Sequence, residues 1–233
     1  MYEYTGRVRY SECDRFGKLS TAGVINYLQD TATLHSEDKN VGLAYLAEHN
    51  IGWVVTNYTM RIRELPKMGD RITIRTYPHS MRTCVAYRSF EMLNGKGERF
   101  AEVISTWALM NIKEMKPVKV TDEMLAAYDP LICPDFSPNS VKLKAEANGE
   151  KVGEFVVTEA EIDTNGHMNN GAYARIAEKF LPEDVKFENM VYSFKKMLFL
   201  DDKAEIFKAV TTDGSIQVQF MKNGEQIFLA QFN

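Results

Sequence analysis

The densest group of side chains that could do chemistry lies in the second half of the sequence, in the run DTNGHMNN that starts at Asp163. Within it, Asp163, Asn165 and His167 bring together a carboxylate, a carboxamide and an imidazole. An imidazole beside a carboxylate can transfer protons near neutral pH, and a carboxamide can donate a hydrogen bond to a developing oxyanion. The three residues together therefore predict an acid–base site.

A helix is expected to begin directly after this group, because apolar residues recur there at helical spacing until Pro182. The N-terminus of a helix exposes N–H donors and carries a partial positive charge, which can stabilise an oxyanion. Asn169 and Asn170 taken alone suit helix capping. His167 has no role in capping, so we interpret the group as functional. The apolar residues of this helix are Ala172, Tyr173, Ile176, Ala177 and Phe180.

A related segment stands in the first half of the chain. The run ECDRFG precedes an expected helix from Ser20 to about Asp38, as EIDTNG precedes the helix described above. Asp14 and Asp163 are 149 positions apart (163 − 14), and the glycines that end the two runs share this offset. The common order of strand, aspartate loop, helix and further strands indicates an internal duplication.

Strand patterns occupy most of the remaining sequence, and short turns such as Asn94-Gly95 and Asn223-Gly224 join them. Long strands with short turns predict an antiparallel sheet in each half and an α+β fold class. Residues 117–140 contain four prolines, so we expect a linker there between domains at 1–116 and 141–233. The expected strands cover 53–63, 70–77, 84–93, 100–112, 189–198, 203–211, 215–221 and 226–232.

Composition excludes several classes of protein. The formal net charge of −4 disfavours general nucleic-acid binding, and no apolar run approaches the length of about 18 residues that spans a membrane. The three cysteines form no pair with metal-ligand spacing, so we expect reduced thiols in a cytoplasmic protein without metal or cofactor. We interpret His35 and His49 as partly buried structural residues in or near the first helix, and His79 follows Pro78 in a turn. Phosphate-loop and serine-hydrolase motifs are absent from the sequence.

Two blocks of the sequence together resemble the acyl-acyl carrier protein thioesterases. They are YSECDRFGKLSTAGVINYLQDTATLHSEDKNVGLAYL in the first half and IDTNGHMNNGAY in the second, which is similar to the catalytic Asp-x-Asn-x-His-x-Asn-Asn motif of that family. The resemblance implies a double hotdog, in which two antiparallel sheets each wrap a central helix. It also implies catalytic roles for Asp163, Asn165 and His167, and a substrate contact at Asn169.

The implied reaction is hydrolysis of the thioester between a fatty acyl chain and its carrier protein, which ends fatty acid synthesis. The first half has Phe16 and Lys18 where the second has Asn165 and His167, so we expect it to be inert and to shape the acyl pocket. The expected pocket residues are Val24, Ile25 and Leu28, for which plain core packing is the simpler interpretation.

One position departs from the family. A glutamate commonly follows a basic pair on the strand after the second helix, but Met197 follows Lys195 and Lys196 here. The alternatives are therefore an acyl-coenzyme A thioesterase and an acyl-binding protein with impaired hydrolysis. The carrier protein is acidic, and we expect basic residues to attract it, with Arg61, Arg63, Lys195 and Lys196 as candidates. The sequence does not define the oligomeric state, and a homodimer is one alternative.

Overall fold

The computed structural model describes residues 1–130, 142–182 and 185–233. The chain divides into two compact units, Met1–Ser140 and Val141–Asn233. Each unit has an antiparallel sheet and one principal helix. No helix in the described part of the chain has both the length and the apolar character needed to cross a membrane.

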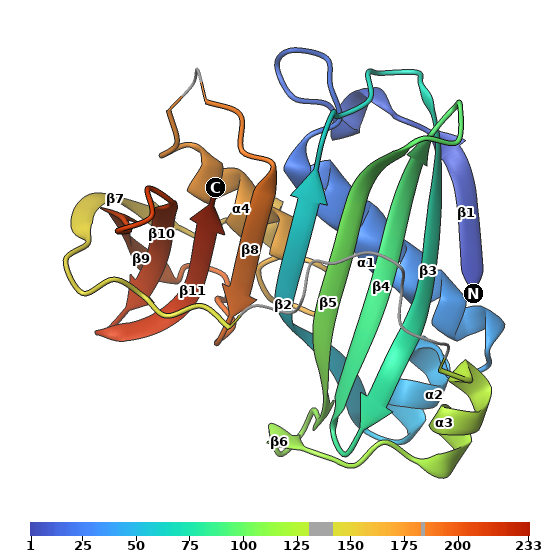
Figure 1. Ribbon diagram of the computed structural model, residues 1–233. Helices are drawn as coiled ribbons and strands as arrows, with labels where there is room; N and C mark the ends of the chain where they lie inside the picture. The colour runs from blue at the N-terminus through green and yellow to red at the C-terminus, as the bar shows by residue number, and fades with distance from the viewer. Residues whose placement is uncertain (131–141, 183–184) are drawn as a thin grey trace. The chain divides into compact units, whose positions relative to one another are not determined.

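The sheet of the first unit has the spatial order β1-β3-β4-β5-β2, and every neighbouring pair is antiparallel. A short strand, β6 (Lys116–Pro117), adds to β5. The helix α1 (Thr21–Asp38) lies across one face of this sheet (Figure 1). The five long strands are β1 (Tyr2–Arg7), β2 (Ile51–Ile62), β3 (Arg71–Arg82), β4 (Val85–Asn94) and β5 (Arg99–Asn111).

The helix α1 begins where the sequence predicts. The Ser20 hydroxyl accepts a hydrogen bond of 3.0 Å from the Gly23 amide, which is an ordinary N-cap. Val24, Ile25 and Leu28 are each 0% exposed, so all three belong to the packed core of this unit. Their contribution to an acyl pocket stays a prediction.

The expected linker at 117–140 begins with structured chain. It contains α3 (Asp122–Tyr128), whose first turn is capped by the Thr121 hydroxyl, 3.1 Å from the Met124 amide. Met124 and Tyr128 pack with Val41, which precedes α2 (Leu43–Glu48). The proline-rich composition concealed this helix, because its apolar residues are too few to show a sustained period. Residues 131–140 of the expected linker lie outside the described residues.

The sheet of the second unit has the order β8-β11-β10-β9-β7, again antiparallel throughout. The helix α4 (Asn170–Glu178) packs its Tyr173 ring against Phe194, Phe220 and Phe228, with centroids 5.2–5.9 Å away. The strands are β7 (Glu150–Val156), β8 (Asn189–Phe194), β9 (Lys203–Val210), β10 (Ile216–Lys222) and β11 (Glu225–Phe232).

The strand expected at 189–198 is shorter than predicted. β8 ends at Phe194, and the amides of Lys195 and Lys196 both donate to the carbonyl of Ile227, at 2.8 and 3.2 Å. Two amides on one carbonyl bend the chain and break the alternation of side chains. Alternation along the strand expected at 189–198 would place Met197 on the same sheet face as Lys195, and this expectation is wrong because β8 ends before both residues.

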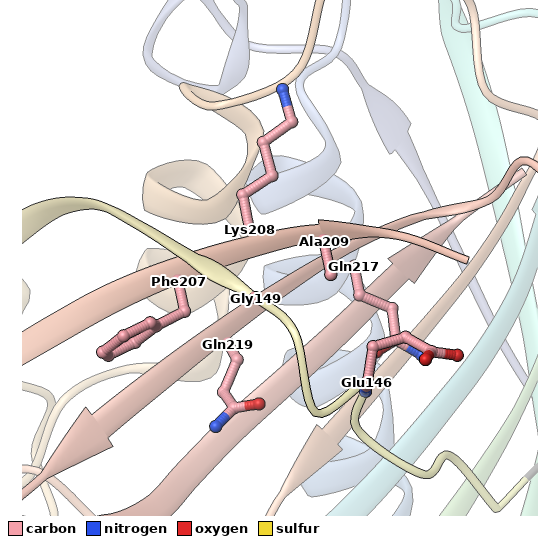
Figure 2. Close-up of a pocket in the computed structure, with 7 residues that line it drawn as sticks. All are labelled: Glu146, Gly149, Phe207, Lys208, Ala209, Gln217 and Gln219. Atoms are coloured by element: carbon pink, nitrogen blue, oxygen red, sulfur yellow. The ribbon is translucent and has the colours of Figure 1, made fainter.

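A small pocket on the second unit has a volume of about 10 Å³, and Figure 2 shows the residues that line it. This is room for about one water molecule, so the pocket cannot hold an organic ligand. None of its lining residues belongs to the Asp163 segment. They are Glu146, Gly149, Phe207, Lys208, Ala209, Gln217 and Gln219.

Candidate functional site

The predicted site residues lie in a tight loop between a short 3-10 turn (Glu159–Glu161) and α4. The Asp163 amide donates to the His167 carbonyl at 2.9 Å, and the Gly166 amide donates to the Asp163 carbonyl at 3.0 Å. Gly166 has a φ of +79°, which favours glycine at this position. The loop therefore brings Asp163 and His167 to the two ends of one closed turn.

His167 faces oxygen atoms with one of its ring nitrogens. Nδ1 lies 3.6 Å from Oδ2 of Asp163 and 3.4 Å from the carbonyl oxygen of Met168. The first distance suits an ion pair with a protonated ring but exceeds a direct hydrogen bond. Oxygens around Nδ1 favour the neutral tautomer that carries its proton there, so Nε2 is left to accept a proton. The side chain is 23% exposed, so a reactant can reach it.

Asn165 and Asn169 occupy different environments. The Asn165 amide donates to Oδ1 of Asp163 at 2.8 Å, and its exposed carboxamide makes no hydrogen bond to any described residue. Asn169 is the N-cap of α4, and its Oδ1 accepts from the Gly171 amide at 2.7 Å. The Asn165 carboxamide is thus free to polarise a carbonyl, whereas the Asn169 oxygen is engaged in capping. The predicted substrate contact at Asn169 would have to use its amide nitrogen.

Glu161 anchors the loop, although it is not among the site residues expected from the sequence. Its buried carboxylate accepts hydrogen bonds from the Thr158 amide (3.1 Å) and hydroxyl (2.6 Å), and it pairs with Arg175 at 2.9 Å. Its main-chain carbonyl accepts from the Asn169 amide at 2.8 Å. Burial opposes ionisation, but these partners hold the pKa of Glu161 below its ordinary value. The Thr-x-x-Glu capping box at 158–161 is the signal that could have revealed it.

A second segment supports the loop from its other side. The Met168 amide donates to the Leu198 carbonyl at 2.8 Å, and the Leu198 amide donates to the Tyr173 hydroxyl at 3.0 Å. Met168 and Leu198 are both buried, so they point to the interior. Met197 directly precedes Leu198 in the chain, so the backbone next to Met197 passes close to the loop at Met168.

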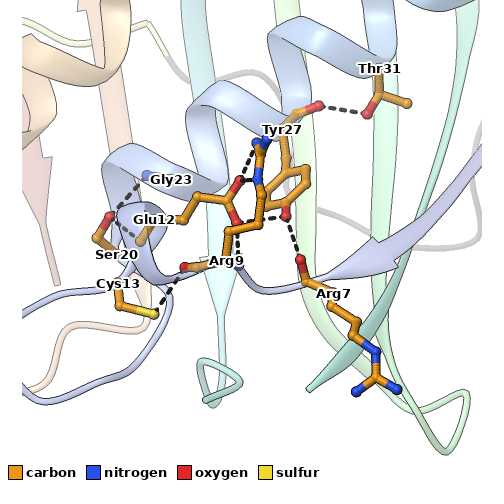
Figure 3. A network of polar contacts seen from close by, with 8 residues as sticks. All are labelled: Arg7, Arg9, Glu12, Cys13, Ser20, Gly23, Tyr27 and Thr31. Atoms are coloured by element: carbon orange, nitrogen blue, oxygen red, sulfur yellow. Dashed lines mark hydrogen bonds and ion pairs between the residues drawn. The ribbon is translucent and has the colours of Figure 1, made fainter. Parts of the chain in front are cut away.

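The first unit repeats this arrangement 149 residues earlier (163 − 14). The Asp14 amide donates to the Lys18 carbonyl at 2.7 Å, and the Ser20 amide donates to the carbonyl of Glu12 at 2.9 Å. Glu12 is buried, and Figure 3 shows its carboxylate between Arg9 and the hydroxyl of Tyr27, at 2.6 and 2.7 Å. The repeat expected from the sequence is confirmed in the backbone. This copy keeps the aspartate, Asp14, but has Phe16 and Lys18 in place of the carboxamide and the imidazole.

The basic residues expected to meet an acidic partner are largely engaged within the chain. Arg63 pairs with the buried carboxylate of Glu102 at 3.1 Å, and Arg61 lies 3.9 Å from it. Lys196 pairs with Glu225 at 2.5 Å. Within the described ranges, no group of three or more His, Cys, Asp or Glu side chains is placed to hold a metal ion.

Comparison with known proteins gives a consistent result. Residues 1–128 match the family model described as the acyl-ACP thioesterase N-terminal domain. The chloroplastic acyl-[acyl-carrier-protein] hydrolase FATB2 of Cuphea viscosissima is 24% identical over 193 residues, which are 76% of this chain and 46% of the relative. The chain spans about half the length of the curated relatives that it matches.

Two solved structures share the fold. An acyl-ACP thioesterase from Bacteroides thetaiotaomicron superposes with a TM-score of 0.90 at 20% identity, covering 99% of this chain and 96% of that one. The 12:0-ACP thioesterase from Umbellularia californica has a TM-score of 0.84 at 16% identity, with coverage of 100% and 96%. The expected α+β double hotdog is therefore confirmed. Because the family model covers more than half of the 233 residues, the chain belongs to the acyl-ACP thioesterase family.

Proposed function

We propose that this protein hydrolyses fatty acyl-acyl carrier protein thioesters and releases the free fatty acid, with Asp163, Asn165 and His167 as the catalytic group. The observation that carries the proposal is the closed loop in which Nδ1 of His167 faces Asp163 Oδ2 at 3.6 Å. Membership of the acyl-ACP thioesterase family supports the carrier protein as the partner. The cytoplasmic location and the homodimer stay predictions.

The proposed reaction follows from the accessible ring nitrogen. Nε2 of His167 accepts a proton from water while the water oxygen bonds to the thioester carbonyl carbon. Asp163 stabilises the resulting imidazolium through Nδ1, and the Asn165 carboxamide donates to the oxyanion. The carbonyl then reforms, the carbon–sulfur bond breaks, and the imidazolium returns its proton to the departing thiolate. Acid and thiol are the products, and the ring ends neutral.

His167→Ala tests this assignment. We expect the rate of hydrolysis to fall by a factor of about 10² to 10⁴, as is typical when a general acid–base group is lost. The matched control is His49→Ala, because His49 is exposed and stacks on Tyr45 at 4.2 Å in the first unit. Full activity in a folded His167→Ala protein, measured on a panel of acyl chains, would remove His167 from the mechanism.

A specific observation favours a second candidate function, acyl binding without efficient hydrolysis. Met197 directly precedes Leu198, whose carbonyl accepts the Met168 amide beside the candidate loop, and the family commonly has a carboxylate at this position. A thioether can neither hold the tautomer of an imidazole nor position water as a carboxylate does. Saturable binding of acyl-carrier protein without turnover would support this candidate. Turnover of acyl-coenzyme A but not of the carrier-bound substrate would indicate the coenzyme A thioesterase instead.

A further inference from the structure

The first unit presents two lysines side by side where the second unit has its candidate site. Lys18 and Lys67 are partners in an isolated antiparallel bridge, so their side chains lie on the same side of it. The adjoining contact, from the Met68 amide to the Gly17 carbonyl, measures 3.0 Å. Like charges directly opposite each other disfavour the folded state. Such a pair calls for an explanation other than stability.

The backbone does not need these lysines. In the second unit the corresponding residues are His167 and Phe199, which are not a pair of cations. The bond between the two segments nevertheless has the same length in both units, from Leu19 to Pro66 and from Met168 to Leu198, at 2.8 Å. The side chains of Lys18 and Lys67 therefore change the surface of the loop without being needed for its backbone hydrogen bonds.

The neighbouring side chains make this surface both cationic and apolar. Phe16 is 73% exposed, with the Arg15 guanidinium carbon 4.8 Å from its ring centroid. Met68 is 54% exposed. An exposed aromatic ring and a thioether among cations are typical of interface anchors.

Two carboxylates near these lysines in the chain, those of Asp14 and Asp70, accept hydrogen bonds from backbone amides. Oδ1 of Asp14 accepts from the amides of Phe16 and Lys18, at 2.8 and 3.0 Å, and Oδ2 of Asp70 accepts from the Lys67 amide at 2.8 Å. Neither lysine forms an ion pair with a residue that the structure describes. Both ammonium groups are thus available to an external partner.

We infer that the surface formed by Arg15, Phe16, Lys18, Lys67 and Met68, here the Lys18 surface, docks the acidic face of the carrier protein. This inference rests on the proposed function, because it takes the acyl-carrier protein as the substrate. The cations would attract the acidic partner and orient it, while Phe16 and Met68 would exclude water from the contact. Lys18 and Lys67 offer the charge that Arg61, Arg63 and Lys196 have committed to internal ion pairs.

The test measures docking separately from hydrolysis. Fluorescein-labelled holo-acyl carrier protein is titrated with wild type, with Lys18→Glu/Lys67→Glu, and with Lys96→Glu/Lys113→Glu as a control of equal charge change at exposed lysines. Fluorescence anisotropy gives Kd at low and at physiological salt. Lys18→Gln/Lys67→Gln serves as a second variant, which relieves the charge repulsion and preserves folding. Thermal unfolding verifies that each protein is folded.

We expect the charge reversal to weaken carrier binding by about tenfold or more, the Gln variant to weaken it less, and the control to stay near wild type. The same loss should appear in kcat/KM for acyl-carrier protein and not for acyl-pantetheine, which lacks the protein. Equal losses in the reversal and the control, or an equal loss on acyl-pantetheine, would overturn the inference. A parallel loss on acyl-coenzyme A with unchanged carrier binding would overturn it in favour of phosphate recognition. Wild-type binding without hydrolysis would refute the proposed function but leave the docking surface supported.

Discussion

Replacing Glu161 by glutamine should loosen the loop that holds the candidate catalytic residues. The Glu161 carboxylate is buried and accepts two hydrogen bonds from Thr158, while its carbonyl receives the amide of Asn169. Glutamine keeps the shape of the side chain but turns one acceptor oxygen into a donor. In one orientation of the glutamine its NH₂ group faces the donors of Thr158, and in the other it faces the Arg175 guanidinium. The ion pair with Arg175 is lost in both orientations.

The magnitude follows from these contacts. A hydrogen bond to a buried charge contributes about 1.5–3 kcal/mol, against about 0.5–1.5 kcal/mol for a neutral one. The Arg175 side chain is 49% exposed, so solvent screening limits its share to about 0.5 kcal/mol. We expect a loss of about 2 kcal/mol in the free energy of unfolding of the second unit. For a chain of this size, that corresponds to a Tm lower by about 4–8 °C.

The pH dependence has a definite sign. The pKa of Glu161 is lower in the folded protein than in the unfolded chain. In an unfolded chain the pKa of a glutamate is about 4.3. The unfolded state therefore binds more protons in this range, and the stabilisation is fully present above the unfolded pKa. It disappears as the pH falls through the folded pKa. The stability difference between wild type and Glu161→Gln should be largest at neutral pH and should shrink below about pH 4.

Glu12→Gln is the matched control, because Glu12 anchors the equivalent loop of the first unit through Arg9 and Tyr27. Calorimetry and hydrolysis rates are measured on both variants. Both should lose stability, but only Glu161→Gln should lower kcat, by about tenfold, since small displacements of reacting groups cost large factors in rate. Unchanged stability and kcat in Glu161→Gln at pH 7, or an equal fall in kcat in Glu12→Gln, would refute the reasoning.

Two further predictions concern single residues. Met197→Glu should increase thioester hydrolysis, because it would add a carboxylate next to Leu198, which contacts the candidate loop at Met168; no gain in a variant that melts like wild type would exclude this role. His35 is 2% exposed, and burial together with the Arg88 guanidinium, 3.0 Å from Nδ1, lowers its pKa to about 3. The unfolded chain therefore binds a proton near pH 6.5 that the folded chain excludes, so stability should fall as the pH drops from about 6.5 towards 3. Urea unfolding of His35→Gln should show a shallower decline, and identical slopes would contradict the assignment.

Much of the fold could be predicted from the sequence, because the decisive signals were local. Asn94-Gly95 and Asn223-Gly224 occupy hairpin turns, and Ser20 caps α1 as expected. The errors arose where a distant group decides the structure. The carbonyl of Ile227 bends the chain after Phe194, although the apolar run Met197, Leu198 and Phe199 favours a longer strand.

The candidate site divides in the same way. Asp163, Asn165 and His167 are close in sequence, so their proximity in one loop was predictable. The supports that fix the loop were not, because they depend on contacts between separate segments. The amide of Leu198 reaches the Tyr173 hydroxyl across 25 positions, and no spacing rule indicates that pairing.

The duplicated loop explains how one backbone can serve two chemistries. Its shape depends on main-chain hydrogen bonds, on the aspartate that closes the turn and on the buried glutamate that anchors it, and both units have all of these. Lys18 in one unit and His167 in the other take part in the hydrogen bonds that close the loop only through their main-chain atoms. Substitutions at this position therefore leave the loop folded while they change its chemistry. In the roles proposed above, a cation at this position attracts an acidic partner and an imidazole transfers protons, so the two copies can differ in chemistry while the loop stays folded.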